Sequence, residues 1–180
     1  MTRLLLLRHA EPANSTQAGE LAAALAGLPL AAVYTSPLAR AADTARAIAG
    51  RHGLTPIEVG ELREIDFGEV EGLAFDDFPA ELQDGLLRVP MTVRFPGGET
   101  YGELKERVCR AIDRIVGSNP ESTVATVTHA GSIRAALAAW LKIADEAVFR
   151  IDQRYGAVNV VDWIDGVPLV RLVNGKRASG

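Results

Sequence analysis

The feature that most constrains the fold is an alternation between short apolar runs and segments with helical patterning. Apolar runs of strand length occur at residues 3–7, 31–35, 56–59 and 123–128. Helical patterns lie between several of these runs, an arrangement typical of parallel strands joined by helices. The alternation therefore predicts an α/β fold in which helices cover both faces of a mainly parallel sheet.

The C-terminal part of the chain shows a different pattern. The stretch AVNVVDWIDGVPLVRLV contains two short apolar segments around Asp165 and Gly166, a turn dipeptide that favours an antiparallel hairpin. With this hairpin, the sequence predicts a six-stranded sheet in a three-layer α/β/α sandwich. The 180 residues, 48% of them hydrophobic, suffice for one core, so we expect a single domain over residues 1–180.

The boundaries of the second predicted helix are marked by residues that favour caps. In TSPLARAADTARAIAGRHG, Ser36 is a suitable N-cap, Pro37 a suitable first residue and Gly53 a suitable terminator. These positions place Arg40 in or near the first turn of the helix.

Two later helices are also expected. Thr100 and Glu103 form a candidate capping box before an apolar stripe at Leu104, Val108, Ile112 and Ile115. The stretch GSIRAALAAWLK follows the fourth strand and has one apolar face. The segment 69–98 is irregular, and we interpret it as an insertion with one short helix at about residues 77–82.

Polar signals follow all four predicted parallel strands. Arg8 and His9 follow the first run, SPLAR the second, LREIDFGEVEG the third and THAG the fourth. Taken singly, each has an ordinary explanation, such as a charged strand exit or a helix cap. In an open parallel α/β sheet, however, ligands bind outside the carboxyl ends of the strands. The convergence of the four signals therefore predicts a functional site at this edge.

In combination and in this order, the motifs resemble the histidine phosphatase superfamily, in its phosphoglycerate mutase-like branch 1. The matching stretches are LLLLRHAE, VYTSPLARAADTARAIA, LREIDFGEVEG, FPGGETYGELKERV and VTHAG. The resemblance implies that His9 is a nucleophile that becomes phosphorylated and that Glu64 is the proton donor. It implies that Arg8, Arg40 and His129 bind phosphate, and that neither a cofactor nor a metal takes part.

These residue types suit phosphoryl transfer. The transferred group spreads negative charge over its oxygens, so catalysis depends mostly on positioning and charge stabilisation. Two guanidinium groups supply permanently charged, forked donors, and a histidine supplies another. His9 must attack as neutral imidazole, whereas Glu64 must carry a proton when the leaving oxygen departs.

The resemblance leaves several functions open. The first is a phosphomonoesterase that hydrolyses a small phosphorylated metabolite, with α-ribazole phosphatase-like specificity as one form. The second is a phosphoglycerate mutase, which must also grip a carboxylate; only Arg88 and Arg94 are basic in the insertion. The third is a non-catalytic module that binds a phospholigand, which would not need a placed acid such as Glu64.

Some positions depart from the family pattern or stay unassigned. Ala10 stands where many members have glycine, and the short loop after it leaves Asn14 and Ser15 without a role. Glu99 matches a position of the family pattern, and the sequence supports for it only a role through neighbouring residues of the site. The acidic residues of the loop, Asp66, Glu69 and Glu71, are interpreted as a solvated surface because no histidines lie at metal-ligand spacing.

Composition narrows the setting. The formal net charge is −4 and the basic residues are scattered, so neither nucleic acid nor a membrane is expected as a partner. The single cysteine, Cys109, cannot form an internal disulfide, which suits a reducing compartment. We therefore expect a cytoplasmic protein; the sequence does not indicate its oligomeric state.

Overall fold

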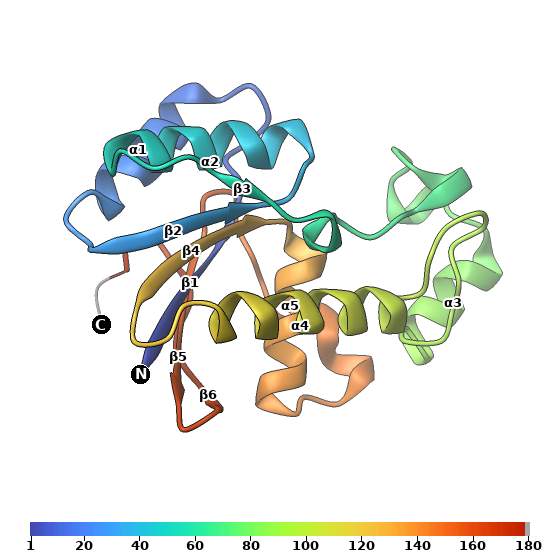
Figure 1. The fold of residues 1–180 in the computed structure, drawn as a ribbon. Coiled ribbons are helices and arrows are strands. Elements are labelled where there is room, and N and C mark those ends of the chain that lie inside the picture. The colour runs from blue at the N-terminus through green and yellow to red at the C-terminus, as the bar shows by residue number, and fades with distance from the viewer. Residues whose placement is uncertain (179–180) are drawn as a thin grey trace.

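Six strands form one sheet in the computed structural model, which describes residues 1–178 (Figure 1). Across the sheet their order is β3-β2-β4-β1-β5-β6. Their bounds are Thr2–Arg8 (β1), Leu30–Thr35 (β2), Ile57–Glu58 (β3), Thr123–Thr128 (β4), Val158–Ile164 (β5) and Val167–Gly175 (β6). The first four strands are parallel, whereas β5 is antiparallel to β1 and β6 is antiparallel to β5. The predicted mainly parallel sheet with an antiparallel hairpin is confirmed.

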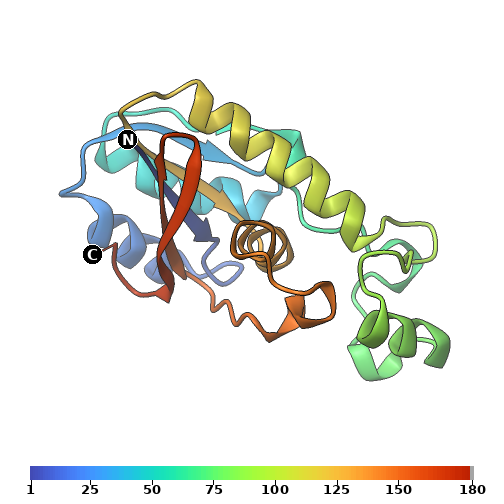
Figure 2. The same cartoon turned by 90° about the horizontal axis from the view of Figure 1, so that it is seen from below.

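Helices cover both faces of the sheet, so the predicted three layers are also confirmed (Figures 1 and 2). One face carries α1 (Ser15–Leu25) and α2 (Ala39–Arg51), and the other carries α4 (Tyr101–Gly117) and α5 (Ala130–Leu141). The position of β1 in the sheet explains its four consecutive leucines. Leu4 and Leu6 pack in the core beneath α4 and α5, and Leu5 and Leu7 pack in the core beneath α1 and α2. A central strand buried on both faces needs an unbroken apolar run.

The insertion extends beyond the sheet, past the N-terminal end of α4 (Figure 2). It contains α3 (Ala80–Arg88), and its buried side chains Leu82, Leu86 and Phe95 belong to the same apolar cluster as the core beneath α4 and α5. The predicted helix at about 77–82 is misplaced. Phe78 precedes Pro79 and is extended, as residues before proline usually are, so the helix begins only after the proline. The remaining helical turns are 3₁₀: Gly60–Leu62, Gly68–Val70, Phe75–Asp77 and Asp145–Arg150.

The predicted helix caps have mixed outcomes. The capping box of Thr100 and Glu103 is confirmed, and α2 ends at Arg51 with His52 as its C-cap, before a left-handed Gly53. The Ser36 cap is wrong: α2 begins at Ala39 after an extended Leu38. The Ser36 hydroxyl instead contacts a histidine, as described below.

None of the helices in residues 1–178 has both the length and the apolar character that a membrane span requires.

Candidate active site

Three central, neighbouring strands each deliver one side chain to the same point. His9 follows β1, Ser36 follows β2 and His129 follows β4, which lies between the other two. Backbone hydrogen bonds continue past the strand ends, from His9 N to Thr128 O (3.0 Å) and from Ser36 N to Val127 O (2.9 Å). The sheet ladder therefore fixes the relative positions of the three residues.

His9 is held as a neutral imidazole. Its side chain is buried, and its Nδ1 lies 2.6 Å from the carbonyl oxygen of Ala10. Because a carbonyl only accepts, Nδ1 carries the proton and Nε2 has a free lone pair. Arg40 Nε donates to this lone pair over 3.3 Å. Burial, together with the charges of Arg40 and Arg8, lowers the pKa of His9 to about 4.

His129 presents its other nitrogen. Its Nε2 lies 2.8 Å from Ser36 Oγ, and its ring centroid lies 5.0 Å from that of His9. Its Nδ1 is buried and has no hydrogen-bond partner among residues 1–178. Burial, followed by the interaction with His9 and the nearby charges of Arg40, Arg8 and Arg107, lowers the pKa of His129 to about 2. If the Ser36 hydroxyl donates to Nε2, Nδ1 carries the proton and is a free donor.

The two arginines come from different elements, Arg8 from the end of β1 and Arg40 from the first turn of α2. Arg8 donates through Nη1 to the carbonyl oxygen of Gln153 and lies 3.8 Å from the ring centroid of Tyr155. Burial lowers the pKa of Arg8, but a guanidinium remains charged in proteins. Within the described part of the chain, the buried Arg8 Nε has no partner. Arg8 Nε is therefore a buried donor that an anion would satisfy, and His129 Nδ1 is a second one in the tautomer that a hydrogen bond from Ser36 selects.

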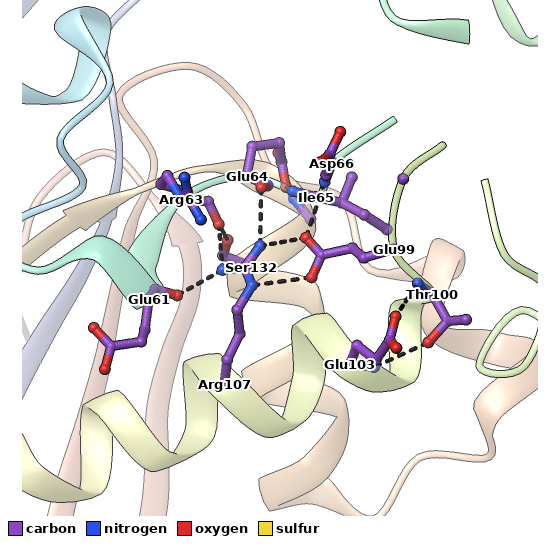
Figure 3. Close-up of polar contacts among 12 residues, drawn as sticks. Glu61, Arg63, Glu64, Ile65, Asp66, Glu99, Thr100, Glu103, Arg107 and Ser132 are labelled. Carbon is purple, nitrogen blue, oxygen red and sulfur yellow. Dashed lines mark hydrogen bonds and ion pairs between the residues drawn. The ribbon is translucent and has the colours of Figure 1, made fainter. Parts of the chain in front are cut away.

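Glu64 lies in the loop after the turn Gly60–Leu62 (Figure 3). Its Oε1 accepts from Ile65 N (2.9 Å), and its Oε2 accepts from Gly131 N (3.0 Å) at the start of α5. Glu64 and Arg40 line the same cavity, of about 260 Å³. The predicted site residues thus meet at one edge of the sheet, with Glu64 at the side that faces the insertion.

A larger groove, of about 1010 Å³, lies between α1 and the end of β6. It adjoins the cluster through Tyr155, whose ring centroid is 5.5 Å from that of His9, and through Gly156, whose backbone N–H donates to the carbonyl oxygen of His9. We place the candidate active site at the histidines rather than in this groove, because the buried unpartnered donors lie at the histidines.

The structure adds residues that sequence reasoning did not find. The sequence favours Ser36 as a cap, but its complete burial and its contact with His129 explain it better. Tyr155 carries no motif and approaches from a distant part of the chain.

Asn14, which has no role in the sequence analysis, caps α1 by accepting from Gln17 N, which accounts for it structurally. Ala10 is buried and does not need a left-handed backbone, so it replaces glycine without strain. Among the described residues, no cluster of histidine, cysteine and carboxylate side chains could hold a metal.

Comparisons with known proteins agree with the resemblance. The bifunctional protein Rv2228c of Mycobacterium tuberculosis is 33% identical over 196 residues, covering 96% of this chain and 54% of that protein. The chain thus spans about half the length of this relative. A 2,3-bisphosphoglycerate-dependent phosphoglycerate mutase of Thermoplasma acidophilum is 30% identical, covering 81% of this chain and 70% of the relative. Phosphoserine phosphatase 1 of Hydrogenobacter thermophilus is 28% identical, with coverages of 79% and 78%.

Among solved structures, Bacillus stearothermophilus YhfR superposes with a TM-score of 0.87 at 25% identity, covering 99% of this chain and 98% of that one. The sequence model of the histidine phosphatase superfamily (branch 1) matches residues 11–176, and Arg8 and His9 lie just before the matched segment. A match over most of the chain, with the same fold and relatives on both sides of the phosphatase and mutase division, assigns the family. This chain belongs to branch 1 of the histidine phosphatase superfamily.

Proposed function

We propose that the protein is a metal-independent phosphomonoesterase that hydrolyses a small phosphorylated metabolite through a phosphohistidine at His9. The observation that carries this proposal is the cluster of two buried, neutral histidines and two partly buried arginines, in which Arg8 Nε and His129 Nδ1 have no partner among the described residues. A phosphoryl group would satisfy these donors and neutralise the two guanidinium charges. The phosphatase among the relatives supports the same activity.

In the first step, His9 Nε2 attacks phosphorus, so an N–P bond forms as the ester P–O bond breaks. In the free protein, Arg40 Nε donates a hydrogen bond of 3.3 Å to His9 Nε2. A bound phosphoryl group would accept this hydrogen bond instead and leave the Nε2 lone pair free to attack. Glu64 gives its proton to the departing oxygen. Each carboxylate oxygen accepts one backbone N–H and keeps a second lone pair on which a proton can sit.

In the second step, water attacks the phosphohistidine and the N–P bond breaks. Glu64, now deprotonated, takes the proton of the water and is ready for another cycle. The positive charges of Arg8 and Arg40 and the N–H of His129 stabilise the transferred group in both steps. No step needs a metal, since these donors already supply the charge.

The mutase alternative needs a group that grips a carboxylate. The basic side chains of the insertion are both engaged: Arg88 pairs with Asp84 (2.7 Å), and Arg94 pairs with Glu103 (2.5 Å). This favours the phosphatase over the mutase, although a mutase is among the relatives. A module that only binds phospholigands would have no use for a carboxylic acid held beside the pocket.

Product analysis tests the proposal. The protein is incubated with 3-phosphoglycerate, O-phosphoserine and p-nitrophenyl phosphate, and free phosphate and the 2-isomer of phosphoglycerate are measured. Phosphate release from an alkyl ester supports the phosphatase, and formation of the 2-isomer would indicate a mutase. The absence of both products would indicate a protein that only binds phospholigands. Rapid quenching should trap an acid-labile, base-stable phosphoenzyme that His9→Ala does not form. A label that persists in His9→Ala would overturn the assignment of the nucleophile.

A further inference from the structure

Arg107 of α4 is the centre of a hydrogen-bond network around the loop that carries Glu64 (Figure 3). Its Nη1 donates to the carbonyl oxygens of Glu61 (2.6 Å) and Arg63 (2.8 Å). Its Nη2 donates to the carbonyl oxygen of Glu64 itself (2.9 Å). Two further bonds go to the carboxylate of Glu99. All five donors of the guanidinium are used.

Glu99 completes the network from the other side. Its Oε1 accepts from Arg107 Nε (3.0 Å) and its Oε2 from Arg107 Nη2 (2.7 Å), the bidentate pairing that suits a guanidinium. Glu99 Oε2 also accepts from the backbone N–H of Asp66 (2.9 Å). The loop is therefore held before Glu64 by Arg107 and after it by Glu99.

This pair holds backbone rather than the Glu64 carboxylate. Both side chains are mostly buried, with exposed fractions of 18% for Arg107 and 17% for Glu99. A purely stabilising ion pair would not need three carbonyl groups from one short loop. Buried pairs often add little stability, because removing the charges from water offsets their attraction. What the network fixes is the path of the loop from Glu61 to Asp66.

The placement of the Glu64 carboxylate is correspondingly tight. Its two oxygens accept from Ile65 N and Gly131 N, so it bridges its own loop and the start of α5. A Cβ on Gly131 would lie 2.3 Å from Glu64 Oε1. A small shift of the loop would therefore break the contact with α5 and move the carboxylate relative to His9.

We propose that Arg107, paired with Glu99, is a positioning residue that sets the Glu64 carboxyl at the distance needed to protonate the leaving oxygen. The inference rests on the proposed function and deepens it, since Arg107 acts through the loop and not on the substrate. Lysine cannot replace it, because a compact ammonium with three donors cannot reach three carbonyls and a carboxylate together. Misplacement of a catalytic group by about 1 Å can lower a rate about 10²-fold.

Single-turnover phosphorylation of the enzyme tests the inference. The substrates are p-nitrophenyl phosphate, whose leaving group hardly needs a proton, and whichever of O-phosphoserine and 3-phosphoglycerate turns over faster. Arg107→Lys should slow phosphorylation by the alkyl ester about 10- to 100-fold and by p-nitrophenyl phosphate less than about threefold. Glu99→Gln, which keeps the shape of the carboxylate and removes its charge, should act in the same direction, so the test survives if Arg107→Lys folds poorly.

The decisive measurement is the double variant. If Arg107 acts through Glu64, Arg107→Lys should cause no further selective loss in a Glu64→Gln background. Arg114→Lys is the matched control: Arg114 lies on the same helix and binds the side chain of Glu61, not the backbone of the loop, and should leave both rates unchanged.

The outcomes separate the two proposals. Equal slowing with both substrates, or multiplied effects in the Glu64→Gln background, would show a merely structural role and overturn the inference alone. A wild-type protein that releases phosphate from no alkyl ester would overturn the proposed function, and the inference with it.

Discussion

Ser36 Oγ lies 2.8 Å from His129 Nε2, and both residues are almost completely shielded from solvent. Ser36 Oγ also accepts from Leu38 N over 3.3 Å, so its own proton is available for the histidine. A hydroxyl that donates to Nε2 selects the tautomer with a proton on Nδ1, the nitrogen that has no partner in residues 1–178. The Ser36 hydroxyl thus determines which ring nitrogen of His129 is a donor in the site.

Ser36→Ala should therefore weaken catalysis, although Ser36 acts through His129 and not on the substrate. Without the hydroxyl, both tautomers of His129 become accessible, and the Nδ1 donor is present only part of the time. We expect kcat to fall by up to about 10²-fold, the lower end for loss of one preorganised donor. Nitrogen NMR of the imidazole should show the tautomer change. Ser122→Ala, an exposed hydroxyl far along the chain, is the control; an unchanged tautomer in Ser36→Ala would contradict the argument.

Ser36 also shows where the sequence was insufficient. A serine before a proline and a helical pattern predicts a cap, and the same hydroxyl can instead serve a buried histidine. The choice depends on the order of the strands, because only a sheet in which β4 lies beside β2 brings Ser36 to His129. Tyr155 escaped prediction for a similar reason: it reaches Arg8 from a loop that precedes β5 and carries no pattern of its own.

Other features followed from local chemistry. The apolar run at residues 3–7 predicted a strand, and Asp165 and Gly166 predicted the hairpin, since each depends on neighbouring residues alone. The carboxyl-edge rule predicted that His9 and His129 would meet, because parallel strands end at the same edge. The insertion was the least predictable part. Its buried apolar side chains and its helix after Pro79 depend on packing that no periodicity reveals.

Arg40→Ala should cost roughly 3 kcal/mol or more of transition-state stabilisation, by comparison with the loss of one preorganised oxyanion donor. Arg40 also holds the lone pair of His9 Nε2, so its loss removes a charge and a contact from the nucleophile. The measurement is kcat/KM with p-nitrophenyl phosphate. Arg46→Ala, on an exposed part of the same helix, should be silent. A loss of less than about tenfold would place Arg40 outside the reaction.

The two buried histidines predict a loss of stability in weak acid. Burial is the largest cause of the low pKa of both, so they stay neutral in the folded protein while free histidine takes up a proton near pH 6.5. Between pH 6.5 and about 4, the unfolded chain thus binds more protons at His9, and the free energy of unfolding falls as the pH falls.

Denaturant unfolding at pH 7.5 and pH 5 measures this effect. The wild-type protein should lose about 2 kcal/mol more over this interval than His9→Gln, which has no group to protonate there. His52→Gln, at the end of α2, leaves both buried histidines in place and serves as the control. Equal losses in wild type and His9→Gln would show that His9 is not held neutral by the fold.

Hydrolysis of p-nitrophenyl phosphate should survive a chelator. The guanidinium groups of Arg8 and Arg40 and the N–H of His129 supply the charge stabilisation that a metal would otherwise give. The measurement compares initial rates after dialysis against EDTA with rates after readdition of divalent ions. Complete loss of activity with EDTA, restored by a divalent ion, would contradict the metal-independent mechanism.

Gly131→Ala should separate folding from chemistry at the Glu64 site. Alanine favours a helix more than glycine, so α5 itself should not be weakened. The new methyl group would lie 2.3 Å from Glu64 Oε1, which must move because the helix backbone cannot. Phosphorylation by an alkyl ester should therefore slow by about 10- to 100-fold, while phosphorylation by p-nitrophenyl phosphate changes much less. Gly117→Ala in α4, where a Cβ meets nothing within 4 Å, is the matched control. A Gly131→Ala protein that melts normally and keeps the wild-type rate with the alkyl ester would show that the proton does not come from Glu64.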